Sequence, residues 1–240
     1  ARELAKLRAY AGQYILFHDQ HVPVEPHWWV APRTLAFDLD YASLWRASRH
    51  GDFQGVRCRL MSAEWSLLVL CLHGTKEKWH KLKWIIDIAM FGPAHPQLDW
   101  AALQQLASQQ GCLRMLDMAL LLAHRLLGMA LPEPFRLRVT GDAPLSQRVD
   151  DAMAQLRGER EPEPGPYHLC RAYWQARERR RDRWRYALRT VFTPRVSHYR
   201  LLPLPRVLSP LYIPIKLVWD HLLGPLRRQW RARRARRLAC

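Results

Sequence analysis

The sequence is poor in acidic residues and has no long apolar run. Aspartate and glutamate number 21 against 38 lysines and arginines, so the 240-residue chain has a formal net charge of +17. Because no stretch of about 18–20 residues is apolar without interruption, the sequence predicts no transmembrane helix. It also shows no secretory signal peptide. A strongly basic chain favours anionic partners such as nucleotides, nucleic acid or an acidic membrane surface.

The chain also lacks paired cysteines. Its five cysteines are scattered and include no CxxC spacing. No histidine or cysteine pair within a predicted helix has the spacing of metal ligands, which disfavours a helical metal or haem protein. Scattered cysteines are typical of a reducing compartment, where they serve as small buried residues. We therefore expect a cytoplasmic protein.

Hydrophobic residues make up 49% of the chain, which excludes a disordered tail or a low-complexity protein. β-Branched and aromatic residues predict a short antiparallel hairpin over 13–18 and 22–30, and a further strand over 56–60. Asp38 or Asp40 is expected to cap a short helix that continues through Trp45. Helical spacing predicts helices over residues 2–10, 62–72, 79–90, 99–111, 113–127, 146–158 and 167–192, and a last helix from residue 216.

A proline-rich stretch divides the chain. Residues 159–166 (EREPEPGP) contain three prolines and one glycine, a composition that predicts a semi-rigid linker. Residues 61–158 before it are expected to form a helical bundle. Residues 167–240 after it are expected to form a basic helical region.

The most informative segment is residues 62–91, SAEWSLLVLCLHGTKEKWHKLKWIIDIAMF. His73, His80 and Asp87 are spaced seven apart, but a break at His73-Gly74-Thr75 would remove them from a common face. Metal ligands on a helix recur at three or four residues, so this spacing favours metal only weakly. Four lysines surround the two tryptophans of its second half. On residue types alone, this half is a solvated helix face with the tryptophans in the core.

This segment resembles the uncharacterised nucleotidyltransferase family of bacteria, whose pattern is close to S-x-E-x-x-L-x-x-L-C-x-H-G-x-K-H-x-W-x-x-L-K-W-x-x-D-x-A. Its matches are Ser62, Glu64, Leu67, Leu70, Cys71, His73, Gly74, Lys76, Trp79, Leu82, Lys83, Trp84, Asp87 and Ala89. Glu77 stands where the family usually has histidine. Residues 24–28 (VEPHW) resemble the family's V-[ED]-x-H-W strand, and the stretch from residue 192 to 212 resembles its closing segment.

The resemblance implies transfer of a nucleoside monophosphate from a nucleoside triphosphate to an acceptor, with Mg²⁺ as cofactor. It implies a mainly α fold with a short N-terminal β hairpin, in which residues 1–60 are the remnant edge of an α/β nucleotidyltransferase sheet and the rest is helical. It makes Glu25 and His27 the candidate catalytic residues, with Glu25 also a metal ligand. The candidates for binding the nucleotide or the acceptor are His73, Lys76, Lys83, Trp84 and Asp87.

Two elements that the resemblance implies are missing from the sequence. A Gly-Ser turn would bind the triphosphate and an Asp-x-Asp strand would hold the metal ions, but no Gly-Ser dipeptide occurs. Asp38-Leu39-Asp40 is the one tempting Asp-x-Asp, and it directly precedes a helical pattern, where aspartate is an ordinary cap. We therefore expect this chain to be inactive alone, with the missing elements preceding Ala1 in a longer protein or lost.

Two arginine-rich segments suggest an alternative. Residues 171–189 contain eight arginines and residues 227–237 contain seven, with aromatic residues interleaved in both. Such segments suit base stacking, phosphate contact or an anionic membrane surface. The alternative reading is a non-catalytic basic helical module that binds nucleic acid or an anionic membrane surface. Residues 227–237 would make the weak membrane or polyanion contact.

Overall fold

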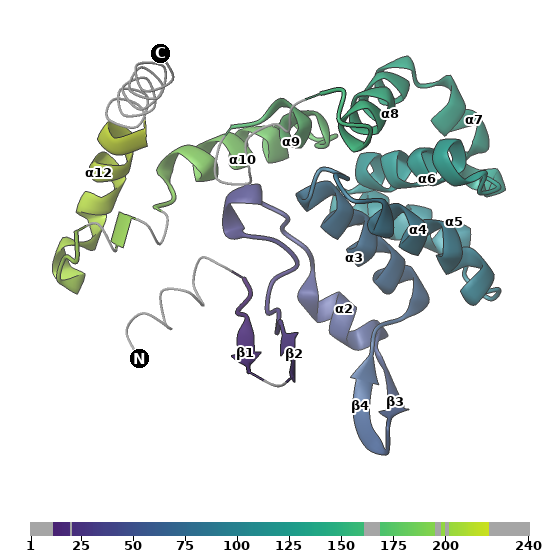
Figure 1. Ribbon diagram of the computed structural model, residues 1–240, viewed down its shortest axis with the longest axis horizontal. Coiled ribbons are helices and arrows are strands. Elements are labelled where there is room, and N and C mark those ends of the chain that lie inside the picture. Colours follow the sequence, from purple (N-terminus) through teal and green to yellow (C-terminus); the bar gives the residue numbers. More distant parts are fainter. Residues whose placement is uncertain (1–11, 20, 161–168, 195–197, 200–201, 221–240) are drawn as a thin grey trace, which may run out of the picture.

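The computed structural model describes residues 12–19, 21–160, 169–194, 198–199 and 202–220 (Figure 1). It is mainly helical with a short N-terminal antiparallel hairpin, as the sequence predicts. The central bundle contains α3 (Ala63–Lys76), α4 (Leu82–Ala94), α5 (Trp100–Gln110), α6 (Leu113–Leu127), α7 (Glu133–Gly141) and α8 (Ala143–Leu156). None of the helices in the described part of the chain combines the length and the hydrophobicity needed to cross a bilayer.

Helix α6 is the centre of the bundle, where it packs against α3, α4, α5, α7 and α8. Every residue from Met115 to Ala123 is buried except Met118, and Leu116, Leu120 and Leu122 are fully buried. This burial results from the five helices around α6. Both ends of the neighbouring helix α5 follow local signals. The Asp99 carboxylate accepts a hydrogen bond from the Ala102 amide at 2.9 Å and begins α5. Gly111 ends α5 in the left-handed conformation.

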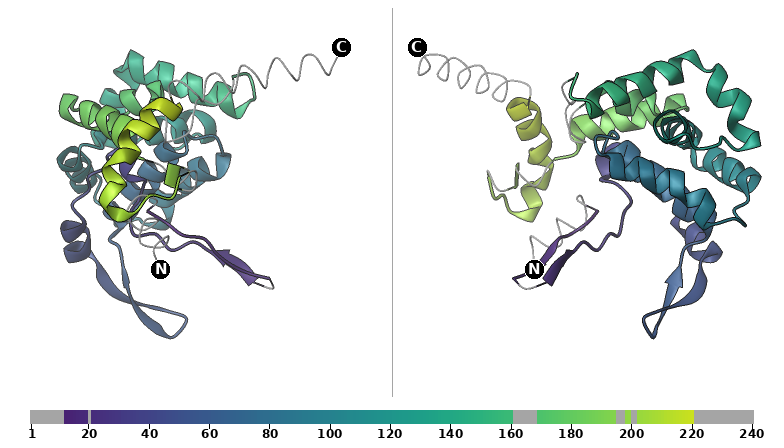
Figure 2. Two further views of the ribbon diagram at one scale, coloured as in Figure 1. Left: turned by 90° about the vertical axis from the view of Figure 1, so that its left-hand side faces the viewer. Right: turned by 45° about the vertical axis from the view of Figure 1, so that its right-hand side comes forward.

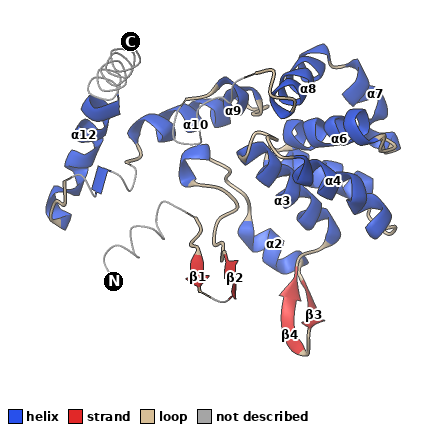
Figure 3. Cartoon of the chain, in the orientation of Figure 1, coloured by secondary structure: helices blue, strands red, loops and turns tan. Residues whose placement is uncertain are grey.

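Strands occur, within the described residues, in two hairpins that extend away from the bundle as separate arms (Figures 2 and 3). In the first, β1 (Leu16–His18) pairs with β2 (His21–Val24). The predicted strand over residues 22–30 is therefore too long, because the continuous ladder ends at Val24 and is followed by an isolated bridge between Gln13 and His27. In the second, the predicted β4 (Val56–Leu60) pairs with β3 (Arg49–Phe53), which the local pattern did not predict.

The predicted helix break at His73-Gly74-Thr75 is wrong, because α3 continues through Gly74 to Lys76. Gly74 is instead the place where the Trp79 ring rests against the helix. A Cβ atom on Gly74 would lie 2.2 Å from Cζ3 of Trp79. The chain turns after α3 instead, with Lys78 and Trp79 at positive φ angles of 54° and 58°. Helix α4 therefore begins at Leu82 rather than at Trp79.

The predicted helix over residues 167–192 is also wrong as one element. It consists of α9 (Arg171–Gln175) and α10 (Arg180–Phe192), separated by a turn in which the Arg177 side chain is buried. Arg177 Nη1 donates to the carbonyl oxygen of Ala36 at 3.0 Å, beside the short helix η1 (Arg33–Leu35). This long-range contact bends the chain, which no local pattern encodes.

The remaining predictions concern the ends of the chain, the linker and the domain boundaries. The last described helix, α12 (Tyr212–Val218), follows η2 (Arg206–Leu211) and begins four residues before the predicted start. It packs on α10, and Lys216 Nζ donates to the carbonyl oxygen of Thr193 at 2.8 Å. The predicted helix over residues 2–10, most of the 159–166 linker and the basic stretch 227–237 lie outside the described residues. The domain boundaries remain predictions.

Candidate functional site

Several positions of the segment resembling the family pattern have structural roles. The Ser62 hydroxyl accepts a hydrogen bond from the Trp65 amide at 3.3 Å and begins α3. Leu67 and Cys71 are fully buried in the bundle core. Gly74 and Trp79 fit one against the other, as described above. These residues set the position and the end of α3, where His73 and Lys76 lie.

A chain of polar contacts joins the two candidate catalytic residues to the end of α3. Lys76 Nζ donates to Oε1 of Gln13 at 3.2 Å, and Gln13 Nε2 donates to Oε1 of Glu25. The other Glu25 oxygen, Oε2, lies 3.7 Å from Nε2 of His27. The structure therefore brings Lys76 together with two candidates that lie about 50 residues earlier in the sequence, Glu25 and His27.

Lys76 is buried, with its side chain 7% exposed, and its Nζ atom lies 3.3 Å from Oε1 of Glu77. Glu77 occupies the position where the family usually has histidine, so in this chain that position balances the charge of a buried lysine. A buried ammonium group requires such partners, because an unpaired charge away from water is costly.

A cleft of about 630 Å³ opens beside these residues. The lining residues are His27, Trp28, Trp29, Val30, Tyr41, Leu44, Trp45, Ser48, Arg59, Met61, Val69, Leu70 and His73. They come from the chain after β2, from α2 (Tyr41–Ala47), from β4 and from α3. The cleft thus combines four aromatic rings with two histidines and one arginine, a composition typical of ligand sites.

Its aromatic wall is held in place by contacts between the lining residues. The rings of Trp29 and Tyr41 meet edge to face with centroids 5.2 Å apart. The Tyr41 hydroxyl accepts a hydrogen bond from the Val30 amide at 3.1 Å. The Arg59 guanidinium lies 5.7 Å from the ring centre of Trp45, which is 54% exposed. A planar ring could stack on Trp45, with Arg59 available for an anionic group.

His73 is the residue of α3 that reaches this cleft. Burial, followed by the charge of Lys76, lowers its pKa below the usual value of 6.5. The imidazole is therefore neutral at pH 7. A neutral ring has one donor nitrogen and one acceptor nitrogen, which suits hydrogen bonding to a ligand or acceptance of a proton.

The remaining candidates lie on α4, outside the lining of the cleft. Trp84 is 8% exposed, and Lys83 Nζ lies 5.6 Å from its ring centre. The His73 ring meets Trp84 edge to face, with centroids 5.7 Å apart, and so connects the two groups of candidates. Asp87 is exposed on α4. A binding role for Lys83, Trp84 and Asp87 remains a prediction.

The described residues do not by themselves make a magnesium site. Within them, no three histidine, cysteine, aspartate or glutamate side chains are grouped so that they could hold a metal ion. Glu25 has Gln13 and His27 as its neighbours, and the Gln13 amide donates to it rather than offering an oxygen. Magnesium prefers near-octahedral oxygen coordination. A magnesium ion at Glu25 would need carboxylates from beyond the described residues.

The Asp-x-Asp sequence at 38–40 has structural roles, as expected for Asp40. The Asp40 carboxylate accepts a hydrogen bond from the Ser43 amide at 3.0 Å and caps α2. Asp38 receives hydrogen bonds from Arg185 and Arg189 of α10, at 2.6 and 2.7 Å. Partial burial raises the pKa of Asp38, but the two arginines outweigh it and the pKa falls below the usual value.

Sequence reasoning missed the aromatic residues that make up most of the cleft. Trp29, Tyr41 and Trp45 were assigned to a strand and a helix rather than to a site. The available signal was the concentration of tryptophans within residues 28–45 of a chain that has 11 in all. Arg59 gave no signal, because it reaches the cleft only through the pairing of β3 with β4.

Comparison with known proteins agrees with the resemblance. Residues 6–128, more than half of the chain, match the family described as uncharacterised nucleotidyltransferase. No curated protein and no solved structure matches the chain. The chain therefore belongs to the uncharacterised nucleotidyltransferase family. The match covers every residue of the cleft, of the Glu25 contacts and of α4.

Proposed function

We propose that this protein takes part in transfer of a nucleoside monophosphate from a nucleoside triphosphate to an acceptor, and that the aromatic cleft holds the nucleobase. The observation that supports this most strongly is the cleft itself. Its volume of about 630 Å³ lies within the roughly 300–1,000 Å³ usual for small-molecule sites. Exposed Trp45 offers a face for a base, and Arg59 offers a cation near the same ring.

In such a transfer, an acceptor oxygen attacks the α-phosphorus and the bond from phosphorus to the pyrophosphate oxygen breaks. The proton of the acceptor must move to a base. His27 is the proposed base, since its ring lines the cleft and Glu25 lies 3.7 Å from its Nε2 atom. A carboxylate beside a histidine orients the ring and stabilises the protonated form. The family resemblance also implies Mg²⁺, whose carboxylate ligands would come from beyond the described residues.

Binding and turnover should therefore separate in this chain. We expect it to bind a nucleoside triphosphate but, alone with Mg²⁺, to release no pyrophosphate. The nucleotide-binding test is calorimetric titration with ATP, GTP, CTP and UTP. Trp45→Ala should weaken the tightest of these by roughly 5–150-fold, because stacking of a base on an aromatic side chain contributes about 1–3 kcal/mol.

Trp184→Ala is the matched control. Trp184 is 64% exposed, close to the 54% of Trp45, but it lies on α10 away from the cleft. It should leave the dissociation constant unchanged. The proposal would be refuted if none of the four nucleotides bound at millimolar concentration. It would also be refuted if Trp45→Ala and Trp184→Ala weakened nucleotide binding equally.

The alternative function, a non-catalytic basic module, receives less support from α10. Arg185 and Arg189 bind Asp38, and Arg183 Nε donates to the Arg177 carbonyl oxygen at 2.8 Å. Arg179 donates to the Gln109 carbonyl oxygen at 3.0 Å. These arginines hold the fold together, so fewer of them are available for a polyanion. Contact through residues 227–237 remains a prediction, which sedimentation with anionic vesicles at low salt would test.

A further inference from the structure

We propose that the segment formed by η2 and α12 docks on an anionic phospholipid bilayer by inserting exposed apolar side chains into the lipid surface. This segment lies apart from the helical bundle in Figure 1 and in the right-hand view of Figure 2. The docking does not depend on the function proposed for the aromatic cleft. It also requires more than a charge contact through residues 227–237, because apolar side chains enter the lipid.

The exposed surface of this segment is apolar. Six large hydrophobic side chains between residues 202 and 218 are more than a third exposed, namely Leu202, Val207, Leu208, Leu211, Ile213 and Val218. Val207 is 88% exposed, more than any other large hydrophobic residue in the described part of the chain. Soluble proteins rarely leave neighbouring apolar side chains in water, and such patches mark sites of contact with proteins or membranes.

The polar residues of α12 are turned toward the rest of the protein. Tyr212 is 1% exposed and Lys216 is 2% exposed. Lys216 Nζ donates to the carbonyl oxygen of Thr193 at 2.8 Å, just beyond the end of α10. The one cation of α12 is therefore held inside the fold, while the exposed residues Ile213 and Val218 are apolar. A charge that would resist entry into lipid is thus removed from the outer surface.

Several backbone polar groups of the segment are already paired or absent. The Tyr212 hydroxyl accepts a hydrogen bond from the Leu204 amide at 2.8 Å and donates to the Leu202 carbonyl oxygen at 2.7 Å. The Leu208 amide donates to the Pro205 carbonyl oxygen at 3.0 Å. Amide hydrogens are absent at the four prolines of the segment, Pro203, Pro205, Pro210 and Pro214. Because unpaired backbone groups are costly in hydrocarbon, this pairing suits a segment that enters lipid.

The charge of this end of the chain favours an anionic surface. Residues 183–240 contain fourteen lysines and arginines and a single acid, Asp220. Asp220 is itself engaged, because its Oδ1 atom lies 3.3 Å from Nε2 of His198. The seven arginines of residues 227–237 begin nine residues beyond the end of α12 in the sequence. Apolar side chains followed by a dense basic stretch are typical of peripheral proteins that bind anionic lipids.

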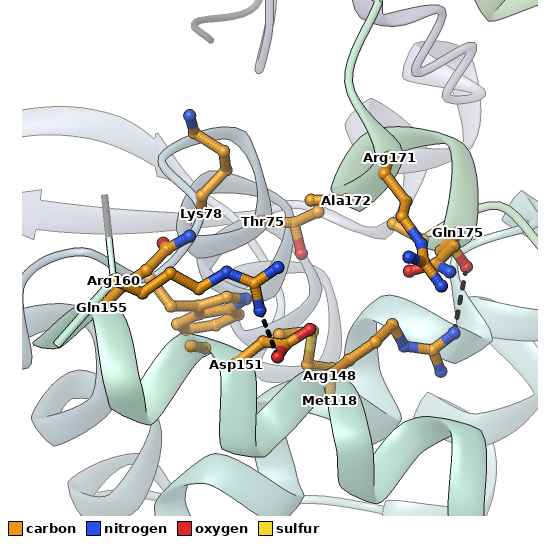
Figure 4. Close-up of a pocket in the computed structure, with 13 residues that line it drawn as sticks. Thr75, Lys78, Met118, Arg148, Asp151, Gln155, Arg160, Arg171, Ala172 and Gln175 are labelled. Carbon is orange, nitrogen blue, oxygen red and sulfur yellow. Dashed lines mark hydrogen bonds and ion pairs between the residues drawn. The ribbon is translucent and has the colours of Figure 1, made fainter. Parts of the chain in front are cut away.

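Several cations around the bundle, by contrast, are engaged within the fold. Figure 4 shows this at a pocket between α3, α8 and α9. Arg160 is paired there with Asp151, and Arg148 Nη1 donates to the Gln175 carbonyl oxygen at 3.3 Å. Such contacts leave less positive charge for a lipid surface, so the bundle is a weaker candidate for docking than the C-terminal segment.

A bilayer suits the apolar side chains better than a protein groove does. The apolar centre of a protein interface requires close shape complementarity. The exposed side chains of this segment come from two successive elements, with Val207, Leu208 and Leu211 on η2 and the others on α12 or before η2. Lipid chains are fluid, so they accept side chains of such an irregular outline without a matched shape.

The test is sedimentation of the full chain with phosphatidylcholine vesicles that either contain or lack phosphatidylserine. It is made at about 0.1 M and about 1 M salt, where the Debye length is about 10 and 3 Å. We expect binding to the vesicles with phosphatidylserine at both salt concentrations, and at least tenfold weaker binding to phosphatidylcholine alone at the lower one. Binding that persists at the higher concentration measures the apolar contribution.

The double variant Val207→Ser/Leu211→Ser removes apolar groups from η2. It should weaken binding to the vesicles with phosphatidylserine at least tenfold, because each methyl or methylene group withdrawn from water contributes about fourfold to the affinity. Both side chains are exposed, so the variant should keep the wild-type Tm.

Leu127→Ser/Leu137→Ser is the matched control. These leucines, on α6 and α7, are 42% and 86% exposed, against 46% and 88% for Leu211 and Val207. Because they lie on the bundle, their replacement should leave vesicle binding unchanged. Trp45→Ala should also leave it unchanged, so failure of the nucleotide proposal stays distinguishable from failure of this one.

Three outcomes would overturn the docking. The first is no sedimentation with phosphatidylserine vesicles at the lower salt concentration. The second is equal vesicle binding by the wild type and Val207→Ser/Leu211→Ser, since residues 227–237 would then bind by charge alone. The third comes from sedimentation velocity without vesicles: a dimer that dissociates in this double variant would assign the apolar surface to a second copy of the chain.

Discussion

Replacement of Gly74 by alanine tests whether the contact between α3 and Trp79 holds the end of the helix. In an exposed helix interior, Gly→Ala stabilises by about 1 kcal/mol, because alanine loses less backbone entropy on folding. At Gly74, however, the new Cβ would lie 2.2, 2.3 and 2.6 Å from three atoms of the Trp79 ring. Ordinary carbon contacts are about 3.5–4.0 Å, so the ring must retreat by more than 1 Å.

The magnitude follows from the rigidity of that ring. Trp79 is 1% exposed and packed in the core cluster, so its ring cannot retreat without disturbing its neighbours. Overpacking of a core costs about 1–3 kcal/mol, and expulsion of the indole would cost more, as large-to-small changes of tryptophan cost about 3–5 kcal/mol. A displacement of more than 1 Å places the cost where these two ranges meet, at about 3 kcal/mol. After the helical gain of about 1 kcal/mol, we expect Gly74→Ala to lower the free energy of unfolding by roughly 2 kcal/mol.

Urea denaturation followed by circular dichroism measures this free energy. Gly141→Ala is the control, because Gly141 lies in α7 and a Cβ atom added there would have nothing within 4 Å, so the change should be neutral or stabilising. In a Trp79→Ala background, Gly74→Ala should become stabilising, because the clash is gone. The reasoning fails if Gly74→Ala is as stable as the wild type, or if its effect is the same in both backgrounds.

Two further predictions use titratable groups. Burial lowers the pKa of His73 in the folded protein, so the unfolded chain takes up the proton first and this group's contribution to stability falls as the pH drops below about 6.5. The stability difference between wild type and His73→Gln should therefore shrink from pH 7 to pH 5 in urea titrations, and parallel curves would contradict this. Arg138 Nη2 donates to Oδ1 of buried Asp117 at 2.6 Å, so Arg138→Met should destabilise by about 3–5 kcal/mol at pH 7. Burial already raises the pKa of Asp117 above its usual value. The loss of stability caused by Arg138→Met should therefore diminish towards pH 4, as Asp117 takes up a proton. A loss of stability that does not depend on pH would show that Asp117 is not its source.

Much of the helical framework could be predicted because its signals are local. Asp40 and Asp99 cap helices through amides three residues away, and the range of α6 coincides with the predicted 113–127. The single helix predicted over 167–192 failed because Arg177 reaches the carbonyl oxygen of Ala36, 141 positions earlier. A contact over that separation leaves no trace in the spacing of neighbouring residues.

The candidate site was predicted only in part. The family pattern drew attention to Glu25, His27 and His73, and the structure places all three at or beside the cleft. The family pattern gave no indication of Arg59, because a residue on a hairpin can be placed only when the pairing of its two strands and the packing of the hairpin are known.

The sequence by itself determined the helical class, the basic charge, most of the helix boundaries and the family to which the chain belongs. These properties depend on composition and on residues that interact within one or two turns of a helix. Only the tertiary structure decided that Gly74 accommodates Trp79 rather than ending α3, that Glu25 connects through Gln13 to Lys76, and which aromatic rings enclose the cleft. Each of these depends on contacts between distant segments, and such contacts exist only after the chain has packed around α6.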